Sequence, residues 1–202
     1  MITFYSGTPG SGKSLHVARD IYNRLVFLKK PVICSFNINT DYISKGGKRR
    51  IGDFVYLPLH EMTVEYFYKY AEEHHVYGKE AQTLVVIDEC QLLFNPREFG
   101  KSDRLKWINF FTVHRHLGFT FILISQFDML VDKQIRSLFE YDVKHRKLSN
   151  IGVFRFIPIK IFCCVSYWYA VKKKLSVEFF VYQRKYSLIY DSFFTVKKIG
   201  VV

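Results

Sequence analysis

The stretch that decides the fold lies near the start of the chain and reads Gly7-Thr8-Pro9-Gly10-Ser11-Gly12-Lys13-Ser14. It fits the phosphate-binding pattern G-x-x-x-x-G-K-[ST] at every fixed position. The glycines let the backbone bend so that successive N–H groups point at an anion, and a helix that starts at the loop adds the positive end of its dipole. The stretch therefore predicts that these eight residues bind the phosphates of a nucleotide.

The flanks of the loop have the pattern that such a site requires. Residues 2–5 read as a short buried strand that runs into the loop, and from Ser14 onward apolar residues recur at helical spacing. In this context we expect Lys13 to reach the β- and γ-phosphates and the Ser14 hydroxyl to ligate Mg²⁺. The alternative is a glycine-rich turn that binds no ligand.

A second signature follows at residues 83–89, where an apolar strand ends in Asp88 and Glu89. In P-loop ATPases the Asp of such a strand binds the Mg²⁺ shell beside the loop Ser or Thr. A Glu directly after it can orient and deprotonate the attacking water. Side chains alternate along a strand, and we expect this alternation to separate the two roles. An ordinary strand that ends in a turn is the alternative.

The remaining pattern alternates strands with helices, which predicts an α/β P-loop NTPase fold with a mostly parallel central sheet flanked by helices. After the strand at 119–124 come Ser125 and Gln126, and a polar residue at this place can sense the γ-phosphate and position water. We favour Gln126 over Ser125, and polar residues that merely begin a loop are the alternative. Further strands are expected at 31–36, 54–57 and 141–147, and helices at 14–28, 60–77, 102–117 and 132–139.

The last part of the chain differs in pattern and in charge. We expect a P-loop ATPase core over residues 1–150 and a small β-rich, basic extension over 151–202 that packs on the core. Residues 142–202 hold 12 Lys+Arg against 3 Asp+Glu, whereas residues 1–141 are nearly balanced. Such a basic part suits nucleic acid or an acidic membrane surface as partner. A solvated basic surface is the alternative.

Cysteine spacing and hydropathy argue against a cysteine-ligated metal site, a secreted protein or a membrane-spanning protein. Cys34, Cys90, Cys163 and Cys164 show no metal-ligand spacing and read as small buried hydrophobes in a reducing compartment. The N-terminus enters the first strand without a signal peptide. The uncharged run at 161–171 is shorter than the ~20 residues that cross a bilayer. We therefore expect no transmembrane segment in this chain.

Taken together, these residues resemble the zonula occludens toxin (Zot) family, the assembly ATPases of filamentous phages and their prophage relatives. The resemblance covers most of the chain, to about Ser192. It rests on GTPGSGKS at 7–14, LVVIDEC at 84–90, NPREF at 95–99, HRHLGFTFILISQ at 114–126, DKQIRSLFEYDVKHRKL at 132–148 and YDSF at 190–193.

The resemblance implies an additional-strand P-loop NTPase, with the acidic strand between the loop strand and its neighbours. It implies a Mg²⁺-dependent ATPase in which Lys13 and Ser14 bind nucleotide and metal, Asp88 is the metal partner and Glu89 is the catalytic base. A trans-acting arginine from a neighbouring subunit is expected among Arg97, Arg115 and Arg136. Arg115 ranks first, although a guanidinium near the ligand edge of the sheet can equally serve an ion pair.

The resemblance also implies a place and partners. Members use ATP at the inner membrane to drive virion assembly and export while single-stranded DNA exchanges its packaging proteins for coat. We therefore expect a homo-oligomer at the cytoplasmic face of the inner membrane, with a phage assembly or membrane partner and single-stranded DNA or a DNA-binding phage protein. Typical members continue into a transmembrane segment and an external domain, whereas this chain stops at Val202. It is either a cytoplasmic fragment or a short version recruited by a membrane partner.

Two other functions fit the same motifs. One is a P-loop kinase that transfers phosphate to a small molecule, which has less reason for a Glu directly after the metal-binding Asp. The other is a non-catalytic assembly platform that nucleotide merely stabilises.

Overall fold

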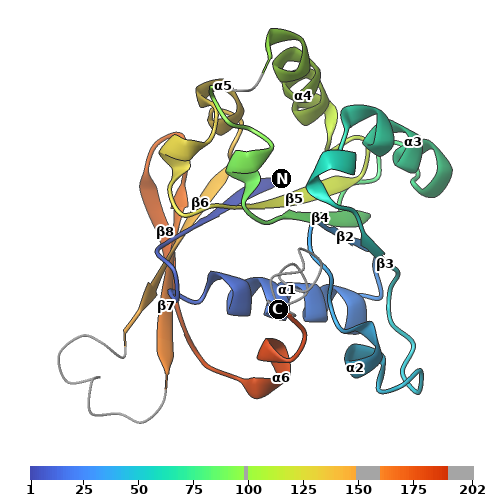
Figure 1. Cartoon of the computed structure of the whole chain (residues 1–202), viewed down its shortest axis with the longest axis vertical. Helices are drawn as coiled ribbons and strands as arrows, with labels where there is room; N and C mark the ends of the chain where they lie inside the picture. Colours follow the sequence, from blue (N-terminus) through green and yellow to red (C-terminus); the bar gives the residue numbers. More distant parts are fainter. Residues whose placement is uncertain (98–99, 149–159, 191–202) are drawn as a thin grey trace, which may run out of the picture.

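One eight-stranded sheet forms the centre of the computed structural model, which describes residues 1–97, 100–148 and 160–190 (Figure 1). Its strands at 2–6, 32–34, 54–56, 83–87 and 119–124 are short, mostly apolar runs. Apolar runs of three to six residues suit strands that are covered on both faces. The strands are β1 (Ile2–Ser6), β2 (Val32–Cys34), β3 (Phe54–Tyr56), β4 (Thr83–Ile87), β5 (Phe119–Ile124), β6 (Tyr141–Lys147), β7 (Ile161–Trp168) and β8 (Lys173–Val181).

The strand order is β3-β2-β4-β5-β1-β6-β7-β8. The strands from β3 to β6 pair in parallel, and β7 and β8 add an antiparallel hairpin to the same sheet. Phe121 of β5 pairs with Ile2 on one side and with Val85 on the other. The acidic strand β4 is therefore not the direct neighbour of β1 that the resemblance implied, because β5 lies between them.

Helices cover both faces of the sheet (Figure 1). The faces alternate along β5: Phe119, Phe121 and Leu123 belong to the core under α3, α4 and α5, whereas Ile122 and Ile124 pack toward α1, α2 and α6. The helices are α1 (Lys13–Val26), α2 (Thr40–Ser44), α3 (Val64–His74), α4 (Lys101–Val113), α5 (Lys133–Arg136) and α6 (Arg184–Ser187). Single 3₁₀ turns are η1 (Leu59–Glu61), η2 (Cys90–Leu92) and η3 (Asp128–Leu130).

An aromatic cluster fixes α3 and α4 on the sheet. Phe67 of α3 is fully buried, and its ring lies 5.6 Å from that of Phe110 on α4 and 5.8 Å from that of Phe121 on β5. The expected helix over 60–77 begins only at Val64 because the Thr63 side chain caps it by accepting from Tyr66 N–H. The short helices α2 and α6 were not expected.

Residues 98–99, 149–159 and 191–202 lie outside the described part of the chain. They include parts of the NPREF and YDSF motifs and part of the expected extension. The boundary near residue 150 therefore stays a prediction. Where the chain is described again, β7 continues the sheet by pairing with β6 rather than forming a second sheet. Among the described helices none is long and apolar enough to span a membrane.

Candidate nucleotide-binding and hydrolysis site

The loop at 7–14 leaves the carboxyl end of β1 and leads directly into α1. Its first amide, Gly7 N–H, donates to the Gln126 carbonyl at 3.2 Å, which ties the loop to the end of β5. Gly7 and Gly12 have φ values of 145° and 100°, a backbone region that L side chains rarely adopt. A Cβ at Gly12 would lie 2.6 Å from the Phe162 ring. The loop needs glycine at these two positions.

Lys13 folds back over the loop, and its ammonium donates to the carbonyls of Gly7 and Thr8. Partial burial lowers the pKa of Lys13, and the carboxylates of Asp88 and Glu89 oppose that shift. The two signatures that are 75 residues apart in sequence therefore lie within electrostatic reach of one another in the fold.

Asp88 is held by three hydrogen bonds at the end of β4. Its N–H donates to Ser35 Oγ at 2.8 Å, Oδ1 accepts from Glu89 N–H at 2.9 Å, and Oδ2 accepts from the Tyr190 hydroxyl at 2.7 Å. Burial raises the pKa of Asp88, while the bonds from Tyr190 and Glu89 and the charge of Lys13 oppose the rise. These three groups favour the ionised form of the Asp88 carboxylate, which is the form that binds a cation.

Glu89 is exposed, and its backbone is left-handed, with φ 49° and ψ 45°. Its carboxylate accepts a hydrogen bond from Gln91 Nε2. The expectation that strand alternation separates Asp88 from Glu89 is wrong because β4 ends at Ile87. The left-handed turn separates them instead, and such a conformation costs a non-glycine residue about 1 kcal/mol or more.

Gln126 and Ser125 lie at the loop, as their place after β5 predicts. Ser125 is buried, and its hydroxyl donates to the Phe127 carbonyl, so it serves the backbone. Gln126 is half-buried and lines a cavity of about 370 Å³ beside Gly7 and Thr8. Its role toward the γ-phosphate stays a prediction.

Two of the three arginine candidates, Arg115 and Arg136, are engaged in ion pairs. Arg115 is exposed, pairs with Glu80 at 3.1 Å and precedes the start of β5. It therefore lies at the amino edge of the parallel strands, opposite the loop, and the expected place near the ligand edge is wrong. Arg136 pairs with Asp128 at 3.8 Å, and Arg97 is exposed. That any of these three arginines acts on the site of a neighbouring subunit stays a prediction.

A buried pair of histidines, one from α1 and one from β6, lies beside the start of the phosphate loop. His16 Nδ1 and His145 Nε2 lie 2.8 Å apart, and His145 Nδ1 bonds to the Ser6 carbonyl at 3.1 Å. Burial lowers the pKa of His145 to about 4, so the ring is neutral at physiological pH. The Cys164 thiol lies next to this pair, and the possible ligand atoms of all three residues are within 4.8 Å of one another. Spacing along the chain did not indicate this proximity.

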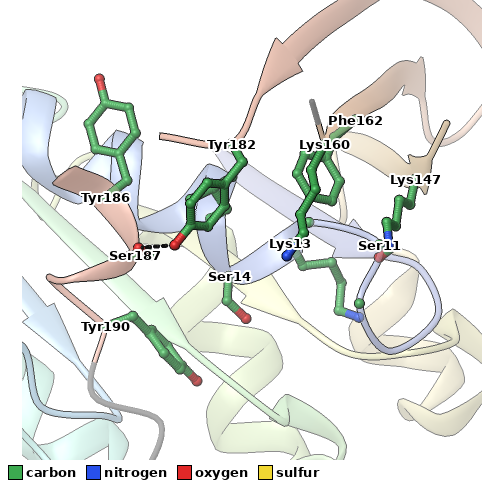
Figure 2. Close-up of a pocket in the computed structure, with 13 residues that line it drawn as sticks. Ser11, Lys13, Ser14, Lys147, Lys160, Phe162, Tyr182, Tyr186, Ser187 and Tyr190 are labelled. Atoms are coloured by element: carbon green, nitrogen blue, oxygen red, sulfur yellow. Dashed lines mark hydrogen bonds between the residues drawn. The ribbon is translucent and has the colours of Figure 1, made fainter. Parts of the chain in front are cut away.

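Sequence reasoning missed Tyr190, which lies between the two expected metal ligands. Besides its bond to Asp88, it interacts with Ser14: burial and Asp88 raise the pKa of Tyr190, and hydrogen bonding with Ser14 opposes the rise. Figure 2 shows Tyr190 and Ser14 on the wall of one cavity. Tyr190 begins the YDSF motif at 190–193, and that motif was the signal that could have identified it.

The residues present fit a Mg²⁺–nucleotide. Backbone amides at a helix start suit phosphates, and a hydroxyl and a carboxylate are the hard oxygen ligands that Mg²⁺ prefers. The cavity over Gly10–Leu15 has a volume of about 380 Å³, within the range of small-molecule sites.

The order of the sheet, with one strand between β1 and β4, and the glycine loop that joins β1 to α1 define a P-loop NTPase. The chain belongs to the Zonular occludens toxin (Zot) family, which matches residues 1–197. Both the predicted fold class and the predicted family are confirmed.

Similar proteins extend this finding. The gene 1 protein of Enterobacteria phage fd is 28% identical over 156 residues, which are 74% of this chain and 43% of the relative. The chain thus spans less than half the length of that relative. The N-terminal domain of zonular occludens toxin from Neisseria meningitidis has a TM-score of 0.53 at 17% identity, covering 94% of this chain and 98% of its own. The DNA-packaging ATPase from Sulfolobus turreted icosahedral virus has a TM-score of 0.53 at 14% identity, covering 88% and 95%. At these identities the two structures support the fold alone.

Proposed function

We propose that this chain hydrolyses ATP with Mg²⁺ and that hydrolysis drives assembly and export of filamentous phage at the cytoplasmic face of the inner membrane. The observation that carries the hydrolysis is that Tyr190, which lines the loop cavity with Ser14, donates to Asp88, so the end of β4 lies next to the phosphate loop. The similarity to gene 1 proteins of filamentous phages supports the biological setting.

Each residue has a distinct role in this proposal. The amides of 7–14 and the Lys13 ammonium hold the phosphates, and Ser14 and Asp88 would hold Mg²⁺. When bound, Mg²⁺ neutralises charge on the β- and γ-phosphates. Glu89 takes a proton from the water that attacks the γ-phosphorus, the β–γ bond breaks, and ADP and phosphate leave. Gln126 positions that water.

The proposal includes partners. An exposed Arg115 can reach the site of a neighbouring copy without losing buried contacts, which suits a homo-oligomer. The exposed Lys172, Lys173 and Lys174 at the β7–β8 turn offer a basic surface to single-stranded DNA, to a DNA-binding phage protein or to an acidic membrane surface.

Release of inorganic phosphate from ATP, with nucleotide binding measured in parallel, tests the enzyme. We expect Lys13→Ala to lose turnover and Glu89→Gln to lower it by about 10²–10⁴-fold while still binding ATP. Glu72→Gln, an exposed change on α3, is the matched control and should leave turnover unchanged. Turnover that needs a second substrate as acceptor would indicate a kinase instead, and binding without turnover in the parent chain would indicate a platform.

A further inference from the structure

The cavity over the loop carries more positive charge than the loop motif supplies. Lys147 at the end of β6 and Lys160 just before β7 line it together with Lys13. The described residues that line it include no Asp or Glu. Asp88 and Glu89 act on Lys13 from outside this lining, and the positive charge of the lining itself favours a ligand that carries several negative charges.

An aromatic ring faces the same cavity from the end of the hairpin (Figure 2). Tyr182 follows β8, and its N–H donates to the Lys160 carbonyl at 2.9 Å, so the two residues are held side by side. The Tyr182 side chain is 44% exposed. The Lys160 ammonium lies over one face of its ring, 5.5 Å from the centroid, so a base that stacks on this face has to displace the ammonium toward the phosphates.

The orientation of Tyr182 is fixed by a hydrogen-bond chain. Ser187 donates its single hydroxyl proton to the Arg184 carbonyl at 2.9 Å, and Tyr182 donates to Ser187 Oγ at 2.6 Å. Because both protons are committed, the ring is pre-organised, and little side-chain entropy remains to be lost when a ligand stacks on it.

The aromatic wall and the phosphate loop are in direct contact. The Phe162 ring packs against Gly12 so closely that a Cβ there would clash, and Phe162 lines the cavity between the loop and Lys160. A ligand whose phosphates lie on the loop therefore reaches the Tyr182 ring within one continuous cavity.

We propose that Tyr182 is the stacking platform for the base of the nucleoside triphosphate, with Lys147 and Lys160 alongside its phosphates. The proposal rests on the proposed function for the phosphate loop. Every base has a π-face, so stacking on Tyr182 favours a nucleotide over bare polyphosphate but does not distinguish ATP from GTP.

Calorimetric titration of the full chain with ATP, GTP and inorganic tripolyphosphate, each with Mg²⁺, tests this platform. Stacking of a base on an aromatic side chain predicts that Tyr182→Ala weakens ATP and GTP binding by about 5- to 100-fold and leaves tripolyphosphate binding unchanged. Tyr182→Phe keeps the ring and should bind both nucleotides within about threefold of the parent. Tyr77→Ala, at an 81% exposed tyrosine outside the cavity, is the control.

Three outcomes overturn the platform. ATP binding that is unchanged in Tyr182→Ala would place the base elsewhere, and equal weakening of ATP and tripolyphosphate would make Tyr182 a structural support of the cavity. A parent chain that binds tripolyphosphate as tightly as ATP would also overturn it. A parent chain that binds none of the three ligands would instead overturn the proposed function, and the platform with it.

Discussion

Tyr190 joins the two expected metal ligands through its hydroxyl, which donates to Asp88 and interacts with Ser14. A hydrogen bond to a charged acceptor contributes about 1.5–3 kcal/mol. That energy stabilises the carboxylate without metal, so Mg²⁺ has to compete with the hydroxyl for Asp88.

We therefore expect Tyr190→Phe to lower the Mg²⁺ concentration for half-maximal nucleotide binding by roughly 10- to 100-fold. A Mg²⁺ titration of nucleotide binding measures this shift. Tyr42→Phe, at an exposed tyrosine of α2, serves as control and should leave the titration unchanged. A Mg²⁺ requirement that rises in Tyr190→Phe would show that the hydroxyl assists the metal rather than competing with it.

At the same scale, the sequence indicates which residues meet but not how they are held. The loop pattern predicts Lys13 and Ser14, and the end of an apolar strand predicts Asp88 and Glu89. The left-handed turn at Glu89 was not predictable, because it depends on where β4 stops pairing. The YDSF motif includes Tyr190, but its contact with Asp88 was not predictable, since the two residues are 102 positions apart.

At the scale of elements, long runs with a clear period were predicted well. The helix after the loop and the buried strands β1, β4 and β5 lie where expected, because apolar spacing and burial agree there. The helices α2 and α6 have only five and four residues, too few for periodicity to indicate. Their positions depend on contacts with the rest of the fold, such as the Asn39 N–H bond to the Ile189 carbonyl.

The β7–β8 hairpin presents the basic surface, and its charge can be tested as a unit. We expect replacement of Lys172, Lys173 and Lys174 by Glu to weaken binding of single-stranded DNA and to reduce the slope of log affinity against log salt by about 2, because fewer counterions are released. Fluorescence anisotropy of a labelled oligonucleotide at several salt concentrations measures both effects.

The matched control for this hairpin carries the same change of charge elsewhere. Lys45, Lys48 and Arg50 are exposed around the turn after α2 and are replaced by Glu in the control. If both triple variants weaken DNA binding equally, net charge rather than the hairpin accounts for the affinity.

At the scale of the whole molecule, Arg115 lies opposite the loop of its own chain, so a role in hydrolysis requires that it act on the loop of a neighbouring copy. Its ion pair with Glu80 is exposed, so Arg115→Ala should cost little stability. We expect the variant to lose turnover by roughly 10³-fold if Arg115 acts in trans on the neighbouring site.

Mixing variants separates this role from a local one. A Lys13→Ala chain supplies Arg115 but lacks a working loop, and an Arg115→Ala chain supplies the loop. Their mixture should hydrolyse ATP faster than either chain alone, and the rate should rise with total protein concentration. Full turnover of Arg115→Ala by itself would remove Arg115 from the site and leave Arg97 and Arg136 as candidates.

The measurement that tests the central claim most directly is a crystal structure of the chain with Mg²⁺ and a non-hydrolysable ATP analogue. We predict the phosphates on the amides of residues 7–14, the metal between Ser14 and Asp88, and Glu89 directed at the γ-phosphate. An analogue bound away from this loop, or a loop with bound analogue from which Asp88 and Glu89 turn away, would contradict it.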